Sequence, residues 1–167
     1  RVKTSLQRLA LQLVGLLPRG ARRFIVRTLR PSWTAGVMAI VERSDGRWLL
    51  VRPVYRKGWA LPGGLLDRGE HTQGAIHREL RDELDITVVL EPDPWMVFDT
   101  VLRRLDVVFR ARLAPGVEPD AVQVATAELD DVGWFDPDQA PLLEEETSDV
   151  LLLRRRVLEG GDALLVV

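Results

Sequence analysis

The chain has 167 residues, of which 46% are hydrophobic and 29% are charged, a composition typical of a soluble globular protein. The length predicts one domain, or one domain with a short extension. It contains no cysteine, which excludes disulfides, thiolate zinc sites and cysteine nucleophiles, and it has only two histidines. Any bound metal is therefore expected to be held by oxygen atoms.

The formal net charge of −2 conceals an uneven distribution of charge. Residues 1–30 contain eight basic side chains and no acidic one, whereas the rest of the chain has an acidic excess of ten. Leucines recur at helical spacing near the start, which predicts an amphipathic helix from about Thr4 to Leu17. We expect residues 1–32 to form a basic helical extension that either packs on the domain of residues 33–167 or binds an anionic partner or membrane surface.

The first half of the domain predicts two strands, a loop and a helix. Alternating residues at 37–41 and an apolar, β-branched run at 48–54 flank turn residues at 44–46, which predicts a β-hairpin. Glycines and a proline between 62 and 69 predict a loop. A helix is then expected from Thr72 to Leu84.

The second half predicts more strands and a final helix. The strands are expected at Thr87–Leu90, Trp95–Val101, Leu105–Leu113 and Val132–Phe135. The second and third of these form a hairpin around Arg103 and Arg104, and Pro115–Asp120 predicts a loop. A helix from Thr147 to Leu158 ends at a glycine pair. Because helices and strands do not alternate regularly, the predicted fold class is α+β with a mixed sheet.

Three carboxylates lie close together on the predicted helix. At about 100° per residue, Glu79, Asp82 and Glu83 fall within roughly a third of the helix circumference. Like charges at this spacing repel unless a cation lies between them, and carboxylates suit Mg²⁺ or Mn²⁺. A solvated acidic helix face is the alternative. The glycines before the helix would let a backbone carbonyl approach the same ion.

The wider spacing favours the metal. The segment from Gly64 to Ile86 resembles the Nudix box, the 23-residue signature of the Nudix hydrolase family. The residues that fall on the signature are Gly64, Glu70, Arg78, Glu79, Leu80, Glu83 and Ile86. Two positions depart from it, since Asp82 stands where the family has Glu and Asp85 stands where it has Gly. The preceding segment, residues 58–64, resembles the Trp-x-x-Pro-Gly-Gly lead-in of the family.

The resemblance implies a fold and an activity. The fold would be a Nudix-like α/β/α sandwich with a mixed β-sheet, preceded here by the basic helix. The activity would be Mg²⁺-dependent hydrolysis of a nucleoside diphosphate linked to another group, with Mn²⁺ as the other suitable ion. The metal ligands or base would be Glu79, Asp82 and Glu83, completed by the Gly63 carbonyl. A structural ion pair would join Glu70 to Arg78.

The two departures have different consequences. Asp82 keeps the negative charge but is one methylene shorter than Glu, which threatens one metal site without excluding activity. Asp85 lies where the helix ends and the family's glycine can take a left-handed conformation. Asp tolerates that conformation better than most residues, so this change concerns stability more than chemistry.

The candidate site residues outside the signature each have more than one interpretation. Glu128 and Asp131 are candidates for the additional acid that many Nudix enzymes bring from a distal loop, and solvated loop acids are the other interpretation. Basic and aromatic residues before the signature could bind substrate, or they could be solubilising charges and a core tryptophan: Arg52, Arg56, Lys57 and Trp59.

The same fold also occurs with two other functions. A non-catalytic nucleotide-sensing or partner-binding module would account for Asp82 and for the basic extension, but retention of Glu79 and Glu83 argues against it. An isoprenoid diphosphate isomerase needs a cysteine, which this chain lacks. We further expect a cytoplasmic location and allow for a homodimer, while the substrate within the nucleotide class stays open.

Overall fold

A computed structural model of the chain describes residue 18 and residues 32–167. The helix predicted from Thr4 to Leu17 and most of the basic extension therefore lie outside the described residues. Residues Thr34–Val167 form one compact unit, and the description below concerns that unit. None of the helices in the described part of the chain is long and apolar enough to cross a membrane.

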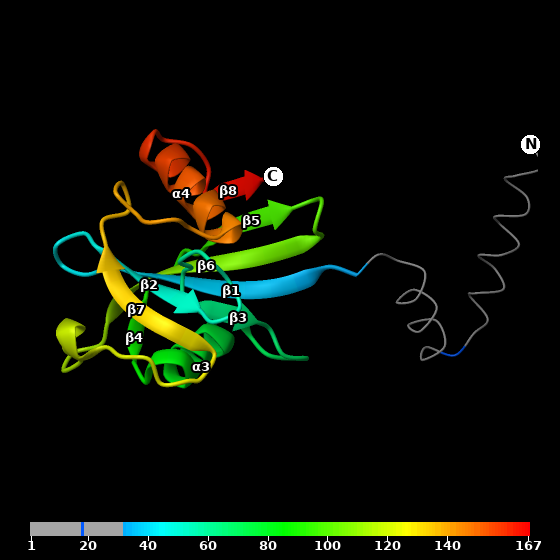
Figure 1. Cartoon of the computed structure of the whole chain (residues 1–167). Helices are drawn as coiled ribbons and strands as arrows, with labels where there is room; N and C mark the ends of the chain where they lie inside the picture. The colour runs from blue at the N-terminus through cyan, green and yellow to red at the C-terminus, as the bar shows by residue number, and fades with distance from the viewer. Residues whose placement is uncertain (1–17, 19–31) are drawn as a thin grey trace, which may run out of the picture. The chain divides into compact units, whose positions relative to one another are not determined.

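The main sheet has six strands, and its order confirms the mixed sheet predicted from the sequence (Figure 1). Along the main path the strands are β3 (Gly63–Leu65), β1 (Thr34–Val41), β6 (Arg104–Leu113), β5 (Trp95–Asp99) and β8 (Leu164–Val166), and β4 (Val88–Leu90) also pairs with β6. The β1–β6 and β5–β8 pairs are parallel and the others antiparallel. A second, two-stranded sheet joins β2 (Trp48–Pro53) to β7 (Leu129–Phe135).

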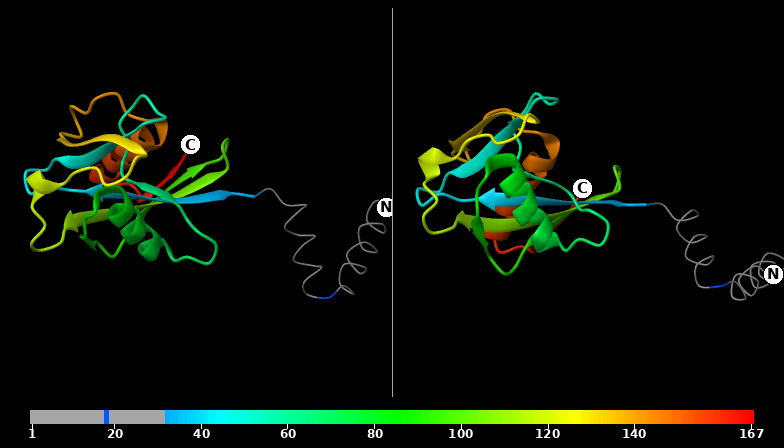
Figure 2. Two further views of the ribbon diagram at one scale, coloured as in Figure 1. Left: turned by 60° about the horizontal axis from the view of Figure 1, so that its bottom comes forward. Right: turned by 90° about the horizontal axis from the view of Figure 1, so that it is seen from below.

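One helix covers each face of the main sheet (Figure 2). Helix α3 (Thr72–Leu84) packs through Ala75, Ile76, Leu80 and Leu84 into one hydrophobic core, and helix α4 (Glu145–Leu158) packs through Val150 and Leu153 into the other. Strand β1 supplies alternate side chains to both cores, because successive residues of a strand point to opposite faces. This arrangement is the α/β/α sandwich expected from the sequence.

The predicted hairpin of residues 37–54 is wrong in its pairing. Strands β1 and β2 are both present, but they belong to different sheets. A single bridge, between Glu42 and Trp48, joins the two segments at the turn. Both edges of β1 are occupied, one by β3 and the other by β6. No edge is left for β2, which pairs with β7 instead.

Two strands were not predicted, and some boundaries moved. The residues expected as a loop at 62–69 begin with β3, which pairs with Val37 and its neighbours in β1. Strand β8 follows the final helix and lies at the sheet edge beside β5. Strand β7 begins three residues earlier than expected, and α4 begins two residues earlier. A short 3₁₀ helix, η1 (Pro119–Ala121), overlaps the end of the loop predicted at Pro115–Asp120. Helix α3 and the β5–β6 hairpin are confirmed.

Helix α3 ends in the left-handed conformation expected at Asp85. The φ and ψ angles of this residue are 53° and 36°. The backbone N–H of Asp85 donates to the carbonyl of Arg81, and that of Ile86 donates to the carbonyl of Leu80. These bonds satisfy carbonyls at the end of the helix, and Ile86 then enters the core.

Replacing Asp85 with Gly is expected to raise the free energy of unfolding by about 0.5–1 kcal/mol, because glycine takes the left-handed conformation without strain. Thermal and urea unfolding measure the change. Asp93→Gly is the matched control, since Asp93 is an exposed aspartate outside the positive-φ positions of the described residues. A loss of stability in Asp85→Gly would contradict the strain argument.

Candidate active site

The carboxylates of α3 are positioned by the residues that bury its other face. Ile76, Leu80 and Leu84 are almost fully buried and fix the rotation of the helix. Glu79 and Glu83 then lie half-buried beside the sheet, and Asp82 is exposed. The helix therefore presents its three acids along one border of the domain, as the spacing predicted.

Two glycines of β3 allow these carboxylates to lie against the backbone. The N–H of Gly63 donates to Glu83 Oε2 at 3.1 Å. A Cβ atom at Gly63, where φ is +149°, would collide with the carbonyl oxygen of Val37. A Cβ atom at Gly64 would collide with the carboxylate of Glu79. Glycine at position 63 is therefore required by the strand pairing, and glycine at position 64 leaves the Glu79 carboxylate in its observed place.

The carboxyl group of Glu83 is poorly suited to carry a charge without a cation. Burial raises the pKa of Glu83 to about 8, although the hydrogen bond from Gly63 opposes the rise. The negative charges of Glu79, Glu128 and Asp82 raise this pKa further. The position thus concentrates negative charge in a partly desolvated place, which is a property of functional sites.

Arg78 joins the loop before α3 to the acids of the helix. Its Nε and Nη2 atoms donate to the two carboxylate oxygens of Glu70, each at 2.9 Å, and its Nη1 donates to Glu79 Oε1 at 2.9 Å. The hydrogen bonds from Arg78 and from the backbone N–H of Asp67 lower the pKa of Glu70 to about 2. Arg78 thereby holds Glu79 as well as the loop.

Replacing Glu70 with Gln is expected to destabilise the protein at neutral pH. Because the pKa of Glu70 is lower in the folded state, the stabilisation is fully present above pH 4.5 and is lost as the pH falls toward 2. The difference in melting temperature between wild type and Glu70→Gln should therefore shrink between pH 5 and pH 3. Glu118→Gln, at an exposed position, serves as the control. A pH-independent difference would contradict the ion-pair explanation.

The structure separates the two distal acids considered from the sequence. Glu128 lies near enough for its charge to raise the pKa of Glu83, and its backbone carbonyl accepts from the N–H of Val54. Asp131 lies on β7 opposite Arg52, with 3.5 Å between Arg52 Nη2 and Asp131 Oδ2. Only Glu128 joins the α3 acids electrostatically.

Replacing Glu128 with Gln is accordingly expected to lower kcat/KM about tenfold, the effect of losing one supporting charge at a metal site. Asp131→Asn provides the matched comparison, and its kcat/KM should stay within about twofold of wild type. Steady-state hydrolysis of one nucleotide substrate measures both. Equal losses in the two variants, or a larger loss in Asp131→Asn, would contradict this assignment.

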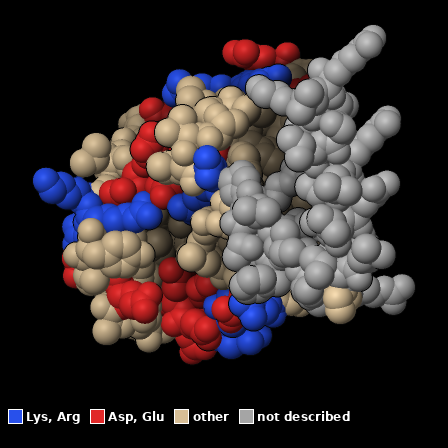
Figure 3. Space-filling view, turned by 90° about the vertical axis from the view of Figure 1, so that its right-hand side faces the viewer, with Lys and Arg blue, Asp and Glu red and all other residues tan. Residues whose placement is uncertain are grey.

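A cavity of about 260 Å³ opens beside these acids. Its lining includes Gly63, Gly64 and Glu83 at the acidic border, with Arg56, Arg104 and Glu146 also in the wall. Acidic and basic side chains lie close together around a hollow on the face shown in Figure 3. Basic side chains and carboxylates thus line the same cavity, which suits a ligand that carries phosphates and binds a metal ion.

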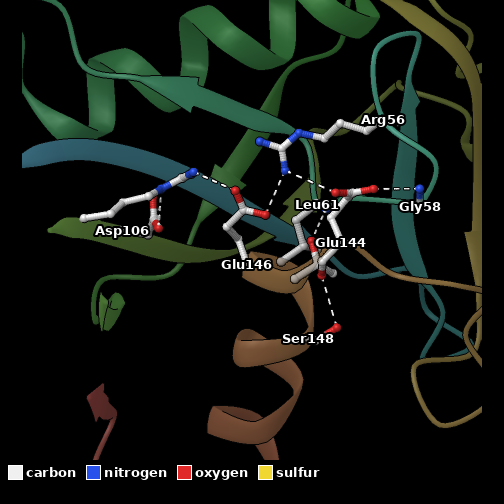
Figure 4. Close-up of polar contacts among 9 residues, drawn as sticks. Arg56, Gly58, Leu61, Asp106, Glu144, Glu146 and Ser148 are labelled. Carbon is white, nitrogen blue, oxygen red and sulfur yellow. Dashed lines mark hydrogen bonds and ion pairs between the residues drawn. The ribbon is translucent and has the colours of Figure 1, made fainter. Parts of the chain in front are cut away.

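A network of ion pairs holds the arginines of this cavity (Figure 4). Glu146 at the start of α4 accepts from Arg56 Nη1 and from Arg104 Nη1, each at 2.8 Å. Arg104 Nε also pairs with the buried carboxylate of Asp106 at 2.8 Å. Glu144 accepts from the backbone N–H of Gly58 at 2.6 Å. The loop that leads into β3 is therefore tied to the first turn of α4.

Burial and these hydrogen bonds act in opposite directions on the acids of the network. Burial is the largest single influence on Glu146 and raises its pKa, but the hydrogen bonds to its carboxylate and the positive charges of Arg56 and Arg104 together leave this pKa below its usual value. Burial dominates at Asp106 and raises its pKa despite Arg104. The charged form of Glu146 is thus favoured, and it keeps both arginines in place.

Of the four substrate-binding residues suggested by the sequence, only Arg56 lines this cavity. The guanidinium of Arg52 lies over the ring of Trp59 at 5.5 Å, and Trp59 meets Phe135 edge to face at 4.5 Å between ring centroids. Lys57 is exposed. Arg104 and Glu146 were not predicted, because tertiary packing alone brings β6 and α4 to the cavity.

The carboxylate oxygens of α3 are of the kind that a hard cation binds, but they are not arranged around one point. Across residue 18 and residues 32–167, no three acidic or histidine side chains already lie close enough to hold a metal ion. One oxygen of Glu79 is engaged by Arg78, and one of Glu83 by Gly63. The mutual repulsion and burial of these carboxylates nevertheless match what a divalent ion would relieve.

Comparison with known proteins assigns the family. The model of the NUDIX domain matches residues 33–157. A MutT-like protein of Streptomyces ambofaciens is 29% identical over 127 residues, which are 76% of this chain and 77% of that protein. The nucleoside triphosphatase NudI of Escherichia fergusonii is 37% identical over 65 residues, only 35% of this chain and 46% of NudI.

A solved structure supports the fold. The NUDIX hydrolase of Nitrosomonas europaea superimposes with a TM-score of 0.66 at 21% identity, covering 83% of this chain and 80% of that one. The chain belongs to the Nudix family. Its enzyme class is that of the Nudix pyrophosphohydrolases.

Proposed function

We propose that the protein is a Mg²⁺-dependent hydrolase that cleaves the pyrophosphate bond of a nucleoside diphosphate linked to another moiety, such as a nucleotide sugar or a nucleoside triphosphate. The observation that carries this proposal is the cavity whose wall brings Glu83 together with Arg56 and Arg104. A diphosphate bound to a cation needs both kinds of wall. The triphosphatase named among the relatives is consistent with this substrate class.

The residues that would hold the cation are Glu79, Asp82 and Glu83, with the Gly63 carbonyl and Glu128 nearby. All are hard oxygen donors, which favours Mg²⁺ and admits Mn²⁺. When bound, such an ion supplies charge neutralisation on the phosphates and a lowered pKa for an attacking water. Asp82 is exposed and shorter than Glu, so we assign it the outermost position in the set.

The other residues position the substrate. Arg56 and Arg104, held by Glu146, would donate to phosphate oxygens at the wall opposite Glu83. Arg78 orients Glu79 and keeps the glycine-containing strand against α3. Glu83, or an acid beside it, would accept the proton of the attacking water from its ionised form, which a bound cation would favour.

A panel of nucleoside diphosphate derivatives tests the proposal. Release of a nucleoside monophosphate is expected for at least one member in the presence of Mg²⁺ or Mn²⁺, and none in the presence of a chelator. Tight nucleotide binding without turnover by either metal would favour the non-catalytic sensing module instead. The cytoplasmic location and the homodimer expected from the sequence stay predictions.

A further inference from the structure

The hairpin between β5 and β6 ends in an apolar tip, formed by Val101, Leu102 and Arg103. The side chain of Val101 is 85% exposed and that of Leu102 is 61% exposed. No other large hydrophobic residue in the described part of the chain is as exposed as Val101. These residues lie outside the cavity and outside both cores. The function proposed above therefore does not use them.

The tip is held in one conformation by its own hydrogen bonds. Asp99 Oδ1 accepts from the backbone N–H of Val101 at 2.8 Å and from that of Leu102 at 2.7 Å. Arg103 takes a positive φ of 54°, which closes the turn. A preformed loop that presents two aliphatic side chains to water loses little conformational entropy when it binds an apolar medium.

The chain enters the fold beside this tip. The backbone N–H of Thr34, the first residue of β1, donates to the carbonyl of Arg103 at 2.9 Å, and Figure 1 shows β1 entering at the end of the sheet where β5 and β6 join. The sequence that precedes Thr34 includes residues 1–30, with eight basic side chains and no acidic one. The apolar tip and the attachment point of this basic sequence are therefore neighbours.

We propose that the β5–β6 tip is the contact of the folded domain with an anionic lipid surface. Basic residues are attracted to anionic headgroups, at about 1 kcal/mol for each Lys or Arg near the surface. Val101 and Leu102 would enter the interface between headgroups and acyl chains, and Arg103 would stay among the headgroups. A nucleic acid is a less suitable partner, because its charged backbone has no apolar surface for the two aliphatic side chains to contact.

The absence of cysteine allows a site-specific test on the full chain. Leu102→Cys labelled with an environment-sensitive fluorophore should show a blue shift with vesicles of phosphatidylcholine containing about 30% phosphatidylserine, and none with phosphatidylcholine alone. The shift should fall at high salt. Leu142→Cys is the matched control, because Leu142 is 71% exposed before α4, and its label should not respond. Equal responses at the two positions, or none at position 102, would overturn the proposal.

A second measurement does not depend on a label. The double variant Val101→Asp and Leu102→Asp should bind the phosphatidylserine vesicles at least about tenfold more weakly in co-sedimentation, whereas Leu142→Asp should bind like wild type. Unchanged binding by the double variant, with an unchanged melting temperature, would overturn the role of the tip. Binding to double-stranded DNA without binding to vesicles would overturn it as well, and would assign the basic sequence to nucleic acid.

Discussion

Replacing Glu83 with Gln is expected to lower kcat/KM for Mg²⁺-dependent hydrolysis by at least about 1000-fold, or about 4 kcal/mol of transition-state stabilisation. Gln has nearly the same shape, and its side-chain oxygen can still accept the hydrogen bond that Gly63 donates. The substitution removes the negative charge and one strong oxygen ligand. The loss therefore reports on chemistry rather than on folding.

Steady-state kinetics with the best substrate of the panel, at saturating Mg²⁺, measures this effect. Glu118→Gln makes the same chemical change at an exposed position away from the cavity, and its kcat/KM should stay close to that of wild type. Activity could be lost because the metal binds more weakly or because the bound metal no longer promotes the reaction. Calorimetric titration with Mn²⁺ distinguishes the two, because loss of a ligand weakens metal binding. A Glu83→Gln enzyme with the wild-type rate would show that Glu83 is not part of the reaction.

When metal is absent, the same substitution should increase the free energy of unfolding. The pKa of Glu83 is about 8 in the folded protein, above its ordinary value of 4.5, so the folded state retains a proton that the unfolded chain gives up. The free energy of unfolding of wild type should therefore fall as the pH rises from 4.5 to 8. Gln does not titrate, and Glu83→Gln should be more stable than wild type at pH 8 by up to about 4 kcal/mol.

Urea unfolding in a chelator at pH 5 and pH 8 measures this difference, which should be small at pH 5 and large at pH 8. Adding Mg²⁺ should stabilise wild type more than Glu83→Gln, because a ligand stabilises the state that binds it. A variant that is less stable than wild type at pH 8 without metal would show that the carboxylate is satisfied by the protein alone.

The sequence predicted those parts of the site that lie close together along the chain. The spacing of Glu79, Asp82 and Glu83 defined one border of a helix whose observed ends match the prediction. Asp85 was expected in a left-handed conformation because of where it stands relative to that helix, and it has that conformation. Both are consequences of local backbone geometry, which a pattern of neighbouring residues contains.

The parts that were missed depend on contacts between distant segments. An alternating pattern identifies β1 as a strand but does not say which strands flank it, so the predicted partner β2 was wrong. Strand β3 consists of two glycines and a leucine, which carry no strand pattern of their own. Arg104 and Glu146 are 42 residues apart, and only the packing of α4 on the sheet brings them together.

Strand β1 separates the two cores and also forms the floor of the site, since Val37 and Met38 pair with Gly64 and Gly63. The acids of α3 lie on one side of it, and the α4 helix that anchors Arg56 and Arg104 packs on the other. The two walls proposed to bind a diphosphate thus share a single strand as their common support. Because both walls pair with or pack on β1, a distortion of this eight-residue strand would alter the separation between the groups proposed to bind the cation and those proposed to bind the phosphates.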